Sequence, residues 1–525
     1  MKKPVILITL FLLFNLCALG ATAYVTPSGA GAMDGTSWAD AYPATALQTA
    51  IDASGIGDEV WVAAGTYHTT TSTDRSISFS MRNGLAIYGS FAGTETQLSE
   101  RNLSNGLTSI LSGEIGGPGT ADNSYKVIYN QQLDSTAVID GFIIEYGNDN
   151  RSPTNSGDGL GGGMCNDGYN TGGFCDPVIR HCLFRNNIAS WGAGAFNNGY
   201  GGGSTLPTYI NCVFAQNHAL IEAGGMDTYA VGGTGSPTVI NTIFYENTSS
   251  TNVGAMYAWG GSGGDCQPVL INCAFINNSA MNGYGGAFIA DNLDPSGGGS
   301  SGTCIVTLQN CIVRNNTTSG SPDGPQFYVR GTGAQVLATY SDIDMTGQNA
   351  PHVISGSGVG NIDLDPLFED IADGVGLDGV WMTSDDGLQL LYTSPCIDAG
   401  DNSGVAEVDL LFNPRILYST VDMGAYEYGQ PTGAIDENSL ILNVEVFPNP
   451  TSDVLNLSFQ NLGKEVVGIS LTDIHGRRIK TIFSDEDSQD LVEYQVDVSN
   501  LESGVYFMII QSNTAQITKR FVKNP

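Results

Sequence analysis

The clearest pattern in the chain is a short segment that recurs about every thirty residues. Each copy contains two short runs with apolar residues at every second position, separated by glycine and asparagine turns, and none shows the 3.6-residue period of a helix. Such alternation is typical of strands that bury one face. Five copies align without gaps, at 179–187, 209–217, 239–247, 270–278 and 308–316.

One column of this alignment contains Cys182, Cys212, Thr242, Cys273 and Cys311, which follow one another after 30, 30, 31 and 38 residues. A unit this short buries its apolar face only by stacking on copies of itself. The repeat therefore predicts an all-β chain wound into a right-handed parallel β-helix, with neighbouring coils about 4.8 Å apart.

In such a solenoid, equivalent residues lie in ladders. The repeated Cys and Phe lie two positions apart, so both point inward, and the cysteines are small core residues. A metal site is the rival interpretation, but the spacing is that of the coil and Thr242 interrupts the column. The column Asn187, Asn217, Asn247, Asn278 and Asn316 predicts a turn whose amides bond the coils above and below. Arg180 interrupts the apolar column of Ile210, Ile240 and Ile271, and the pattern gives no reason for it.

A second column follows a pair of small residues in each unit, and we expect its members to point inward. They are Met164, Phe196, Met226, Met256 and Phe288. Residues one and three positions further along then point outward, and they include Asn197 and Gly199. Six of them define a predicted glycan-binding strip: Asp167, Asp227, Tyr229, Tyr257, Trp259 and Asp291.

The chemistry of this strip suits carbohydrate. Aromatic faces stack on sugar rings, and carboxylates accept hydroxyl hydrogen bonds or hold Ca²⁺. The alternative is that the rings pack against long neighbouring loops. The apolar outward column of Val213, Ile243 and Ile312 indicates that some faces of the solenoid are covered.

A loop at 378–387 concentrates glycines with three carboxylates, Asp378, Asp385 and Asp386. These are predicted Ca²⁺ ligands, with a solvated acidic turn as the alternative, because the spacing does not match an EF-hand. No cofactor is required by the predicted function, and Ca²⁺ is the one candidate.

The net charge of the chain limits the classes of partner that it can bind. Lys and Arg number 19 against 53 Asp and Glu, giving a net charge of −34 in 525 residues. A field of that sign repels nucleic acid and anionic membranes and attracts cations. The length suits two or three domains.

The N-terminal residues have the pattern of an export signal. Lys2 and Lys3 precede an apolar run at 5–19, and Ala21 and Ala23 supply the small residues of a cleavage site, so 1–23 is a predicted signal peptide. The run is too short for a transmembrane segment, and no other run is long enough. Nine cysteines remain after cleavage, and two pairings are open: Cys165 with Cys175, and Cys266 with Cys304.

Segments 24–38, 57–67 and 85–95 resemble the opening of secreted bacterial right-handed parallel β-helix proteins of the pectin-lyase-like superfamily. The resemblance implies a short helix at about 45–54 that caps the first coil. Four further segments are similar to the closing part of choice-of-anchor Q proteins, at 363–368, 394–402, 413–415 and 421–428. We therefore expect a capped β-helix at 24–360, closed by 361–430.

After a polar linker at 431–440, residues 441–525 alternate as strands and predict a small β-sandwich. Four of its motifs resemble the type A C-terminal sorting domain of the type IX secretion system of the Bacteroidetes, at 446–450, 471–477, 501–506 and 519–523. The resemblance implies transit through the periplasm, recognition by the type IX machinery, and surface attachment or release. An ordinary adhesive β-sandwich is the alternative.

Signals for catalysis are sparse. A lyase of this fold needs a basic residue, yet 186–313 contains no Lys or Arg, and a hydrolase needs paired carboxylates. Four arginines flank this stretch, and each is a candidate lyase base or a solvated residue: Arg180, Arg185, Arg314 and Arg330. His181 and His218 form no His/Cys/Asp cluster.

The sequence therefore favours a monomeric exported surface protein that binds glycans or other extracellular material without catalysis. One alternative is a polysaccharide lyase or glycosidase acting on acidic polysaccharide. A second is a structural surface component without a ligand.

Overall fold

The computed structural model describes residues 20–429 and 441–524, except 118, 295–301, 320–323, 350–353, 357, 462–466, 474–477, 486–490 and 512–515. The chain divides into two compact units, 1–430 and 431–525. Most of the predicted signal peptide and the whole predicted linker lie outside the described residues.

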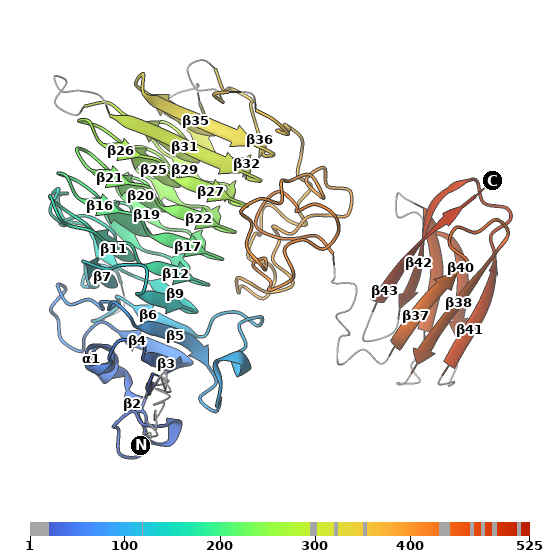
Figure 1. The fold of residues 1–525 in the computed structure, drawn as a ribbon, viewed down its shortest axis with the longest axis horizontal. Coiled ribbons are helices and arrows are strands. Elements are labelled where there is room, and N and C mark those ends of the chain that lie inside the picture. The colour runs from blue at the N-terminus through green and yellow to red at the C-terminus, as the bar shows by residue number, and fades with distance from the viewer. Residues whose placement is uncertain are drawn as a thin grey trace, which may run out of the picture. The chain divides into compact units, whose positions relative to one another are not determined.

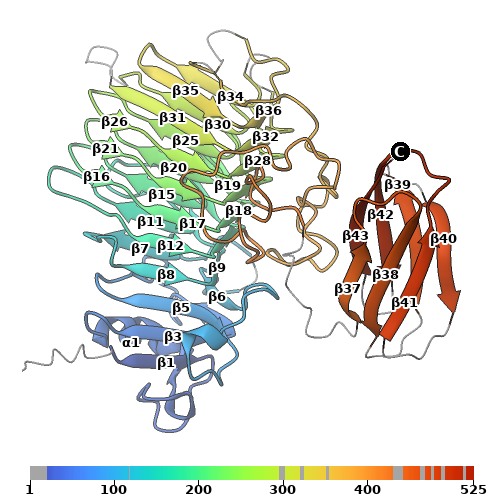
Figure 2. The same ribbon diagram turned by 45° about the vertical axis from the view of Figure 1, so that its right-hand side comes forward.

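The first unit is a stack of coils whose strands form four parallel sheets in the part described (Figure 1). We call these sheets A, B, C and D and give their strands below. A full coil of the chain contributes a strand to sheet A, then to B, then to D and then to C, before the next coil begins at A. Figure 2 shows the strands of successive coils lying one above the other. The parallel β-helix predicted from the thirty-residue repeat is confirmed.

Sheet A contains β1 (Thr22–Thr26), β2 (Tyr42–Pro43), β3 (Glu59–Ala63), β5 (Ala86–Phe91), β8 (Val138–Asp140), β12 (Val178–Arg180), β16 (Ser204–Thr205), β17 (Thr208–Ile210), β21 (Thr234–Gly235), β22 (Thr238–Ile240), β26 (Asp265–Cys266), β27 (Val269–Ile271), β31 (Thr303–Gln309) and β35 (Ala334–Thr339). Sheet B contains β4 (Gly65–His68), β6 (Ser109–Ser112), β9 (Phe142–Glu145), β13 (Leu183–Arg185), β18 (Val213–Ala215), β23 (Ile243–Tyr245), β28 (Ala274–Ile276), β32 (Ile312–Arg314) and β36 (Asp342–Ile343).

Sheet C contains β7 (Ile128–Gln131), β11 (Met164–Asp167), β15 (Ala195–Asn198), β20 (Met226–Tyr229), β25 (Met256–Trp259), β30 (Phe288–Asp291) and β34 (Phe327–Arg330). Sheet D contains β10 (Asn148–Asp149), β14 (Ile188–Trp191), β19 (His218–Glu222), β24 (Thr248–Ser249), β29 (Ser279–Ala280) and β33 (Thr317–Thr318).

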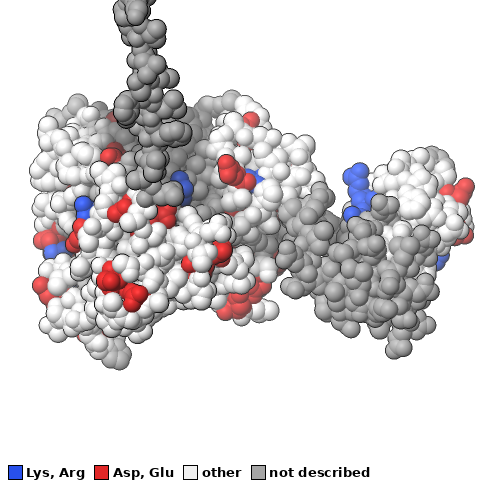
Figure 3. Space-filling model, turned by 60° about the horizontal axis from the view of Figure 1, so that its bottom comes forward, with Lys and Arg blue, Asp and Glu red and all other residues white. Residues whose placement is uncertain are grey.

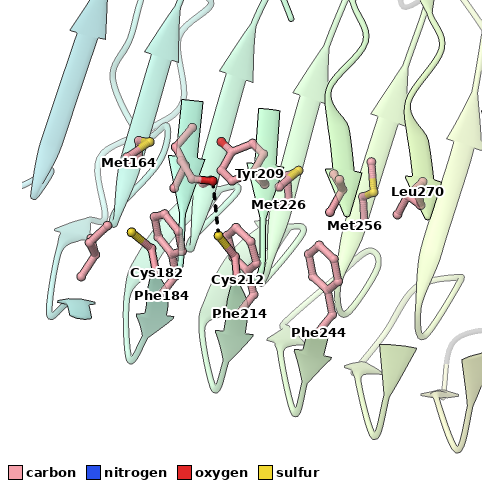
Figure 4. Close-up of a cluster of buried hydrophobic side chains, with 14 of the residues drawn as sticks. Met164, Cys182, Phe184, Tyr209, Cys212, Phe214, Met226, Phe244, Met256 and Leu270 are labelled. Atoms are coloured by element: carbon pink, nitrogen blue, oxygen red, sulfur yellow. Dashed lines mark hydrogen bonds between the residues drawn. The ribbon is translucent and has the colours of Figure 1, made fainter. Parts of the chain in front are cut away.

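The phenylalanines of the repeat form one interior stack. Neighbouring rings of Phe184, Phe214, Phe244 and Phe275 have centroids 4.5, 5.0 and 4.6 Å apart and lie within 6° of parallel. Figure 4 shows three of these rings beside Cys182 and Cys212 in the core. Like side chains therefore do lie on top of one another, as the repeat predicts.

The cysteine column is also part of the core, and its chemistry explains the exchange at Thr242. The thiol of Cys212 donates to the carbonyl of Ile210 at 3.4 Å, and the Thr242 hydroxyl donates to the carbonyl of Ile240 at 3.0 Å. A short donor is what this turn requires, and Cys and Thr both supply one. No group of three His, Cys, Asp or Glu side chains able to hold a metal occurs among the described residues.

Neither predicted disulfide is present, since all nine cysteines described are free and buried. Cys165 lies in a cluster outside sheet C and Cys175 lies in the solenoid core, so the sheet separates their sulfurs. Cys266 and Cys304 are register partners in adjacent strands, but they remain two thiols.

The predicted asparagine ladder is confirmed. The Asn187 amide donates to Asn217 at 3.0 Å and Asn217 donates to Asn247 at 2.9 Å. The ladder continues through Asn278 and Asn316 at 3.0 and 2.9 Å. Each amide thus links its own turn to the next coil, which fixes the register of the stack.

The N-terminal end carries the predicted cap. Helix α1 (Leu47–Ala53) buries Leu47, Ala50 and Ile51 in the solenoid core. The other helical turns, η1 (Trp38–Asp40), η2 (Ala44–Ala46) and η3 (Leu98–Glu100), are single 3₁₀ turns. None of the described helices has the length and apolar character that crossing a bilayer requires.

Residues 361–429 contain no regular strand among the described residues and fold back along the outer face of sheet B (Figures 1 and 2). Their Trp381, Leu388 and Met423 share a hydrophobic cluster with Val213, Ile243 and Ile312. The predicted covering of these outward residues is confirmed, and the cover is this segment.

A second asparagine column holds this segment in place. The amide of Asn241 donates to the carbonyl of Val408 at 2.7 Å, and that of Asn272 donates to Asp422 at 2.8 Å. Asn310 donates to the Asp401 carbonyl at 2.8 Å and accepts from the Asp401 N–H at 2.7 Å. The segment is thus fastened to successive coils by backbone groups that would otherwise be buried unpaired.

The second unit consists of two antiparallel sheets around a shared core, which confirms the predicted β-sandwich (Figure 1). Leu457, Leu471 and Met508 are among its buried residues. One sheet contains β37 (Ile441–Phe447), β38 (Val454–Asn461) and β41 (Leu491–Asp497); the other contains β39 (Val467–Asp473), β40 (Arg478–Asp485), β42 (Gly504–Gln511) and β43 (Gln516–Lys523).

Candidate functional site

The register of sheet C corrects one member of the predicted inward column. Met164 pairs with Ala195, and Cys165 pairs with Phe196. Because this coil carries 31 residues between the paired positions, Ala195 points inward and Phe196 lies in the outer cluster. Asn197 accordingly points inward, where its Oδ1 accepts a hydrogen bond from the buried Tyr209 hydroxyl.

With this register, the outward side of sheet C presents two columns of side chains. The first contains Tyr129, Cys165, Phe196, Asp227, Tyr257, Ile289 and Tyr328. The second contains Gln131, Asp167, Asn198, Tyr229, Trp259, Asp291 and Arg330. All six residues of the predicted glycan-binding strip therefore lie on one outer face.

That face is more covered than the sequence predicts. Tyr229 is 5% exposed and Tyr257 is 3% exposed, and Asp227 and Asp291 are fully buried. Trp259 is only half-buried. The cover comes from turns of the coils themselves, including Leu160, Val231 and Val253. Packing of the rings against loops, the alternative to an open strip, describes most of this face.

Two of the predicted carboxylates have full sets of partners. Asp167 accepts from the Tyr129 hydroxyl at 2.6 Å and from Asn198 at 2.9 Å. Asp291 accepts from the Tyr257 hydroxyl at 2.8 Å and lies 3.3 Å from Nη1 of Arg330. These partners give both groups a structural role within the face.

Asp227 differs from them. Its side chain is completely buried, and neither carboxylate oxygen has a hydrogen-bond partner among the described residues. Burial raises its pKa well above the ordinary value, and the Glu222 carboxylate raises it further. The indole N–H of Trp191, on the preceding coil, is likewise buried without a partner in the part described. An unpaired buried acceptor and an unpaired buried donor thus occur on one flank.

Trp191 and Glu222 lie at the corner of the solenoid that borders Asp227. Trp191 pairs in register with Glu222, and Glu222 bridges to Asn252, so the three stack at the corner between sheets D and C. Gly192, next to Trp191, adopts φ +59°, and a Cβ there would lie 2.9 Å from the Cβ of Asp227. Only glycine allows the corner to approach the Asp227 side chain this closely.

Aromatic rings form a continuous series over this face. Tyr169 and Tyr200 stack with centroids 5.9 Å apart, and Tyr200 lies 5.8 Å from Tyr229. Tyr229 in turn meets Trp259 edge-on at 4.7 Å. We call Tyr169, Tyr200, Tyr229 and Trp259 the aromatic ridge; all but Tyr229 are half-buried and so keep part of their surface open.

The arginines considered for a lyase are mostly in ion pairs. Arg185 lies 2.7 Å from Glu145, and Arg314 lies 2.8 Å from Asp363. Arg330 pairs with Asp291. Arg180 is exposed on the outer side of sheet A, in register with Ile210, which explains how an arginine is tolerated in that column.

The acidic loop at 378–387 directs its carboxylates to the chain itself. Asp385 accepts from the N–H of Asp378 at 3.0 Å and from the Thr383 hydroxyl at 2.8 Å. Asp386 is buried, where the Tyr426 hydroxyl and the Met382 N–H donate to it. The structure therefore does not gather Asp378, Asp385 and Asp386 around one point, and Ca²⁺ binding by them stays a prediction.

The repeat alone does not single out Trp191, Glu222, Tyr169 or Tyr200. Trp191 and Glu222 are the last residues of β14 and β19, and Tyr169 and Tyr200 lie in loops, all outside the segments that align without gaps. A signal for them does exist, since Leu160, Trp191 and Glu222 follow one another at 31-residue intervals, as do Tyr169 and Tyr200. The acidic residues of the first unit are visible as scattered red patches in Figure 3, with few basic groups among them.

The first unit is thus a parallel β-solenoid with an aromatic and acidic flank. Residues 445–524 match the family described as the secretion system C-terminal sorting domain. The chain therefore carries a type IX sorting domain, and the protein is secreted to the cell surface or the extracellular space. No curated protein and no solved structure matches the chain.

Proposed function

We propose that this secreted solenoid binds extracellular glycans without catalysis, and that sheet C carries the binding face. The observation that supports the proposal best is the aromatic ridge, which crosses successive coils on one flank. Tyr and Trp combine an apolar face with a hydrogen-bonding edge, as sugars do. A solenoid repeats such a surface along its axis and so suits an extended polymer.

The half-buried side chains carry the contact in this proposal. Trp259, Tyr169 and Tyr200 keep open surface, and Tyr284 and Tyr328 form another ring pair nearby, with centroids 4.4 Å apart. Tyr229 and Tyr257 support these rings from below. Of the six residues that the sequence predicts to bind glycan, this proposal keeps Trp259 as a direct contact and gives Tyr229 and Tyr257 a supporting role.

The sorting domain supports the extracellular part of the proposal, because it brings the solenoid to the compartment where glycans are met. We also keep as a proposal that 361–430 is a choice-of-anchor Q-like closing segment of a pectin-lyase-like β-helix. A lyase or glycosidase has less support, because three of the four arginines are in ion pairs.

A glycan array with the secreted protein tests the proposal. We expect retention on a subset of glycans, and loss of that retention in a Tyr200→Ala/Trp259→Ala variant. The matched control is Tyr418→Ala, which removes a tyrosine that is 53% exposed on the covering segment. Retention on no glycan, or equal retention by the double variant, would overturn the proposal. Release of unsaturated or reducing ends from a bound polymer would favour the enzyme instead.

A further inference from the structure

We propose that Asp227 binds the ammonium group of an amino sugar, so that the glycan recognised by sheet C is cationic. This inference rests on the proposed function and adds the chemical class of the ligand. It starts from the Asp227 carboxylate, which is fully buried and has both oxygens unpartnered within the described part of the chain.

A buried carboxylate without a partner is unfavourable, and a positively charged donor is the group that relieves this most strongly. The two other carboxylates of the predicted strip, Asp167 and Asp291, do have partners on this face. Asp167 is held by Tyr129, Gln131 and Asn198. Asp291 has the Tyr257 hydroxyl and Arg330. On the same flank, Asp227 alone of these three carboxylates still has its acceptors free.

The surroundings of Asp227 suit a cation rather than a neutral hydroxyl. Phe196 and Tyr257 are its register partners on either side. Tyr229 lies on the same strand, between Trp191 at 5.5 Å and Trp259 at 4.7 Å. Rings placed around an acid attract ammonium ions through their negative faces. Trp191 and Trp259 keep partial exposure, so an incoming group reaches Asp227 by displacing their side chains.

The electrostatics of the flank point the same way. The Glu222 carboxylate acts on Asp227 and on the Tyr257 hydroxyl, and raises the pKa of both. The one cation at this site among the described residues is Arg330, which already pairs with Asp291. A glycan of uronic acids would bring further negative charge to these groups, whereas a free amine would neutralise it. A net charge of −34 extends the same preference over longer range.

The test compares two oligosaccharides that differ only in acetylation. Isothermal titration calorimetry of the full secreted chain is run with a glucosamine hexamer, below the pKa of its amines, and with the N-acetylglucosamine hexamer. We expect the amine form to bind about tenfold more tightly, as one charge-assisted hydrogen bond provides. Choline chloride as competitor shows whether an ammonium group alone, without the sugar, occupies the site.

Two substitutions locate the effect. Asp227→Asn keeps the shape of the side chain, replaces the buried carboxyl group by a neutral amide and leaves the fold intact, as a thermal melt checks. It should reduce affinity for the amine hexamer about tenfold and leave the acetylated hexamer unchanged. Glu222→Gln should give a smaller loss. Glu246→Gln, at a half-buried glutamate on another side of the next coil, is the matched control and should change nothing.

Equal affinity for the two hexamers, or an Asp227→Asn variant that binds the amine form as the parent does, would overturn the inference while leaving glycan binding in place. Displacement by choline would support recognition of the ammonium group, and tight binding of choline with no binding of either hexamer would assign the site to a different ammonium ligand and overturn the amino-sugar assignment. Binding of no glycan at all would overturn the proposed function as well.

Discussion

The outer faces of sheets B and C are built by the same coils, but they meet different surroundings. On sheet B one outward column is apolar from Ile143 through Val213 to Ile312, and residues 361–429 cover it. On sheet C the outward columns mix rings with carboxylates, and only the turns of the coils themselves lie over them. An apolar column on a solenoid thus indicates a cover supplied by the chain itself. A mixed column leaves polar groups that an external ligand can satisfy.

Each face leaves some buried polar atoms unpaired. Where residues 361–429 cover sheet B, the Asn241 amide donates to the Val408 carbonyl, but Asn241 Oδ1, Asp386 Oδ1 and Arg415 Nε have no partner within the described residues. On sheet C, the Trp191 N–H and both oxygens of Asp227 are unpaired in the described part of the chain. Asp227 differs from the acids of the covering segment because neither of its carboxylate oxygens has a partner, and we therefore place the proposed ligand there.

The largest effect is expected on sheet B. Ile243→Ala should destabilise the first unit by about 2–5 kcal/mol, because it opens a cavity between the sheet and the covering segment. Ile240→Ala, three residues earlier on the half-buried outer side of sheet A, should lose only about 1 kcal/mol. Chemical denaturation of both variants measures the difference. Equal losses would mean that residues 361–429 do not stabilise this face.

The next effect concerns pH. Burial raises the pKa of Asp386, in the covering segment, to about 7. A carboxyl whose folded pKa is raised contributes stability below its unfolded pKa and loses it as pH rises through the folded value. We therefore expect the covering segment to be held more weakly at about pH 8 than at about pH 4, by up to about 4 kcal/mol.

Hydrogen exchange of residues 361–429 at the two pH values measures this change, with β22 and β27, which contain no acidic residue, as the internal reference. Asp386→Asn mimics the protonated form and should reduce the pH dependence. An unchanged slope in that variant would assign the titration to other groups of the segment, of which Glu427, with its pKa raised by burial to about 8, and Asp422, with its pKa raised by burial to about 6, are the candidates.

The asparagine ladder should give an intermediate loss that both faces share. Asn247→Ala removes bonds to Asn278 and Phe214 and leaves the acceptors of the neighbouring coils unpaired. We expect about 1–3 kcal/mol from denaturation. Asn282→Ala, an exposed asparagine that donates to the Ser250 carbonyl, is the control and should lose less than about 0.5 kcal/mol. A loss as small in Asn247→Ala would show that the ladder does not hold the coils.

The smallest effects separate the faces most cleanly. Tyr245→Phe, on sheet B, loses a hydroxyl that bonds the Ala372 carbonyl and the Gly374 N–H at 3.3 and 3.1 Å, and should lose about 1 kcal/mol. Trp191→Phe removes an N–H that has no partner in the described structure, and should change stability by less than about 0.5 kcal/mol. Thermal melts with glycan retention as a second readout compare them. A loss in Trp191→Phe as large as that in Tyr245→Phe would contradict the expectation that the unpaired N–H contributes nothing to the fold.

Much of the solenoid follows from the sequence, because its physics is repetitive. Phe184, Phe214 and Phe244 recur at a fixed interval, and only stacking makes a fixed interval useful. The Asn187 column is predicted for the same reason, that one residue type suits one place in every coil, whereas the helix at 45–54 is predicted from the resemblance of the N-terminal segments to known β-helix proteins. The sorting domain is predicted because its motifs are local.

The candidate site follows less well from the sequence, because it depends on where the repeat departs from itself. Sheet C pairs Ala195, and not Phe196, with Met164 and with Met226, 31 residues away on either side, so Phe196 points to the outer cluster. An alignment of the Gly-Gly-Met and Gly-Ala-Phe segments places Phe196 in the inward column instead. The burial of Tyr229 and Tyr257 depends on turns of variable length. The partners of Asp167 come from the two neighbouring coils, one on each side. In the sequence, burial of a sheet face by a distant segment is indicated only by an apolar column of outward residues.

The claim that sheet C is the binding face is tested most directly by hydrogen exchange of the secreted protein with and without the glycan that it retains best on the array. The account predicts that residues 226–229 and 256–259, and the end of β14 at Trp191, gain protection, while sheet B and its covering segment do not change. Protection confined to sheet A, to the covering segment or to the sorting domain would contradict it.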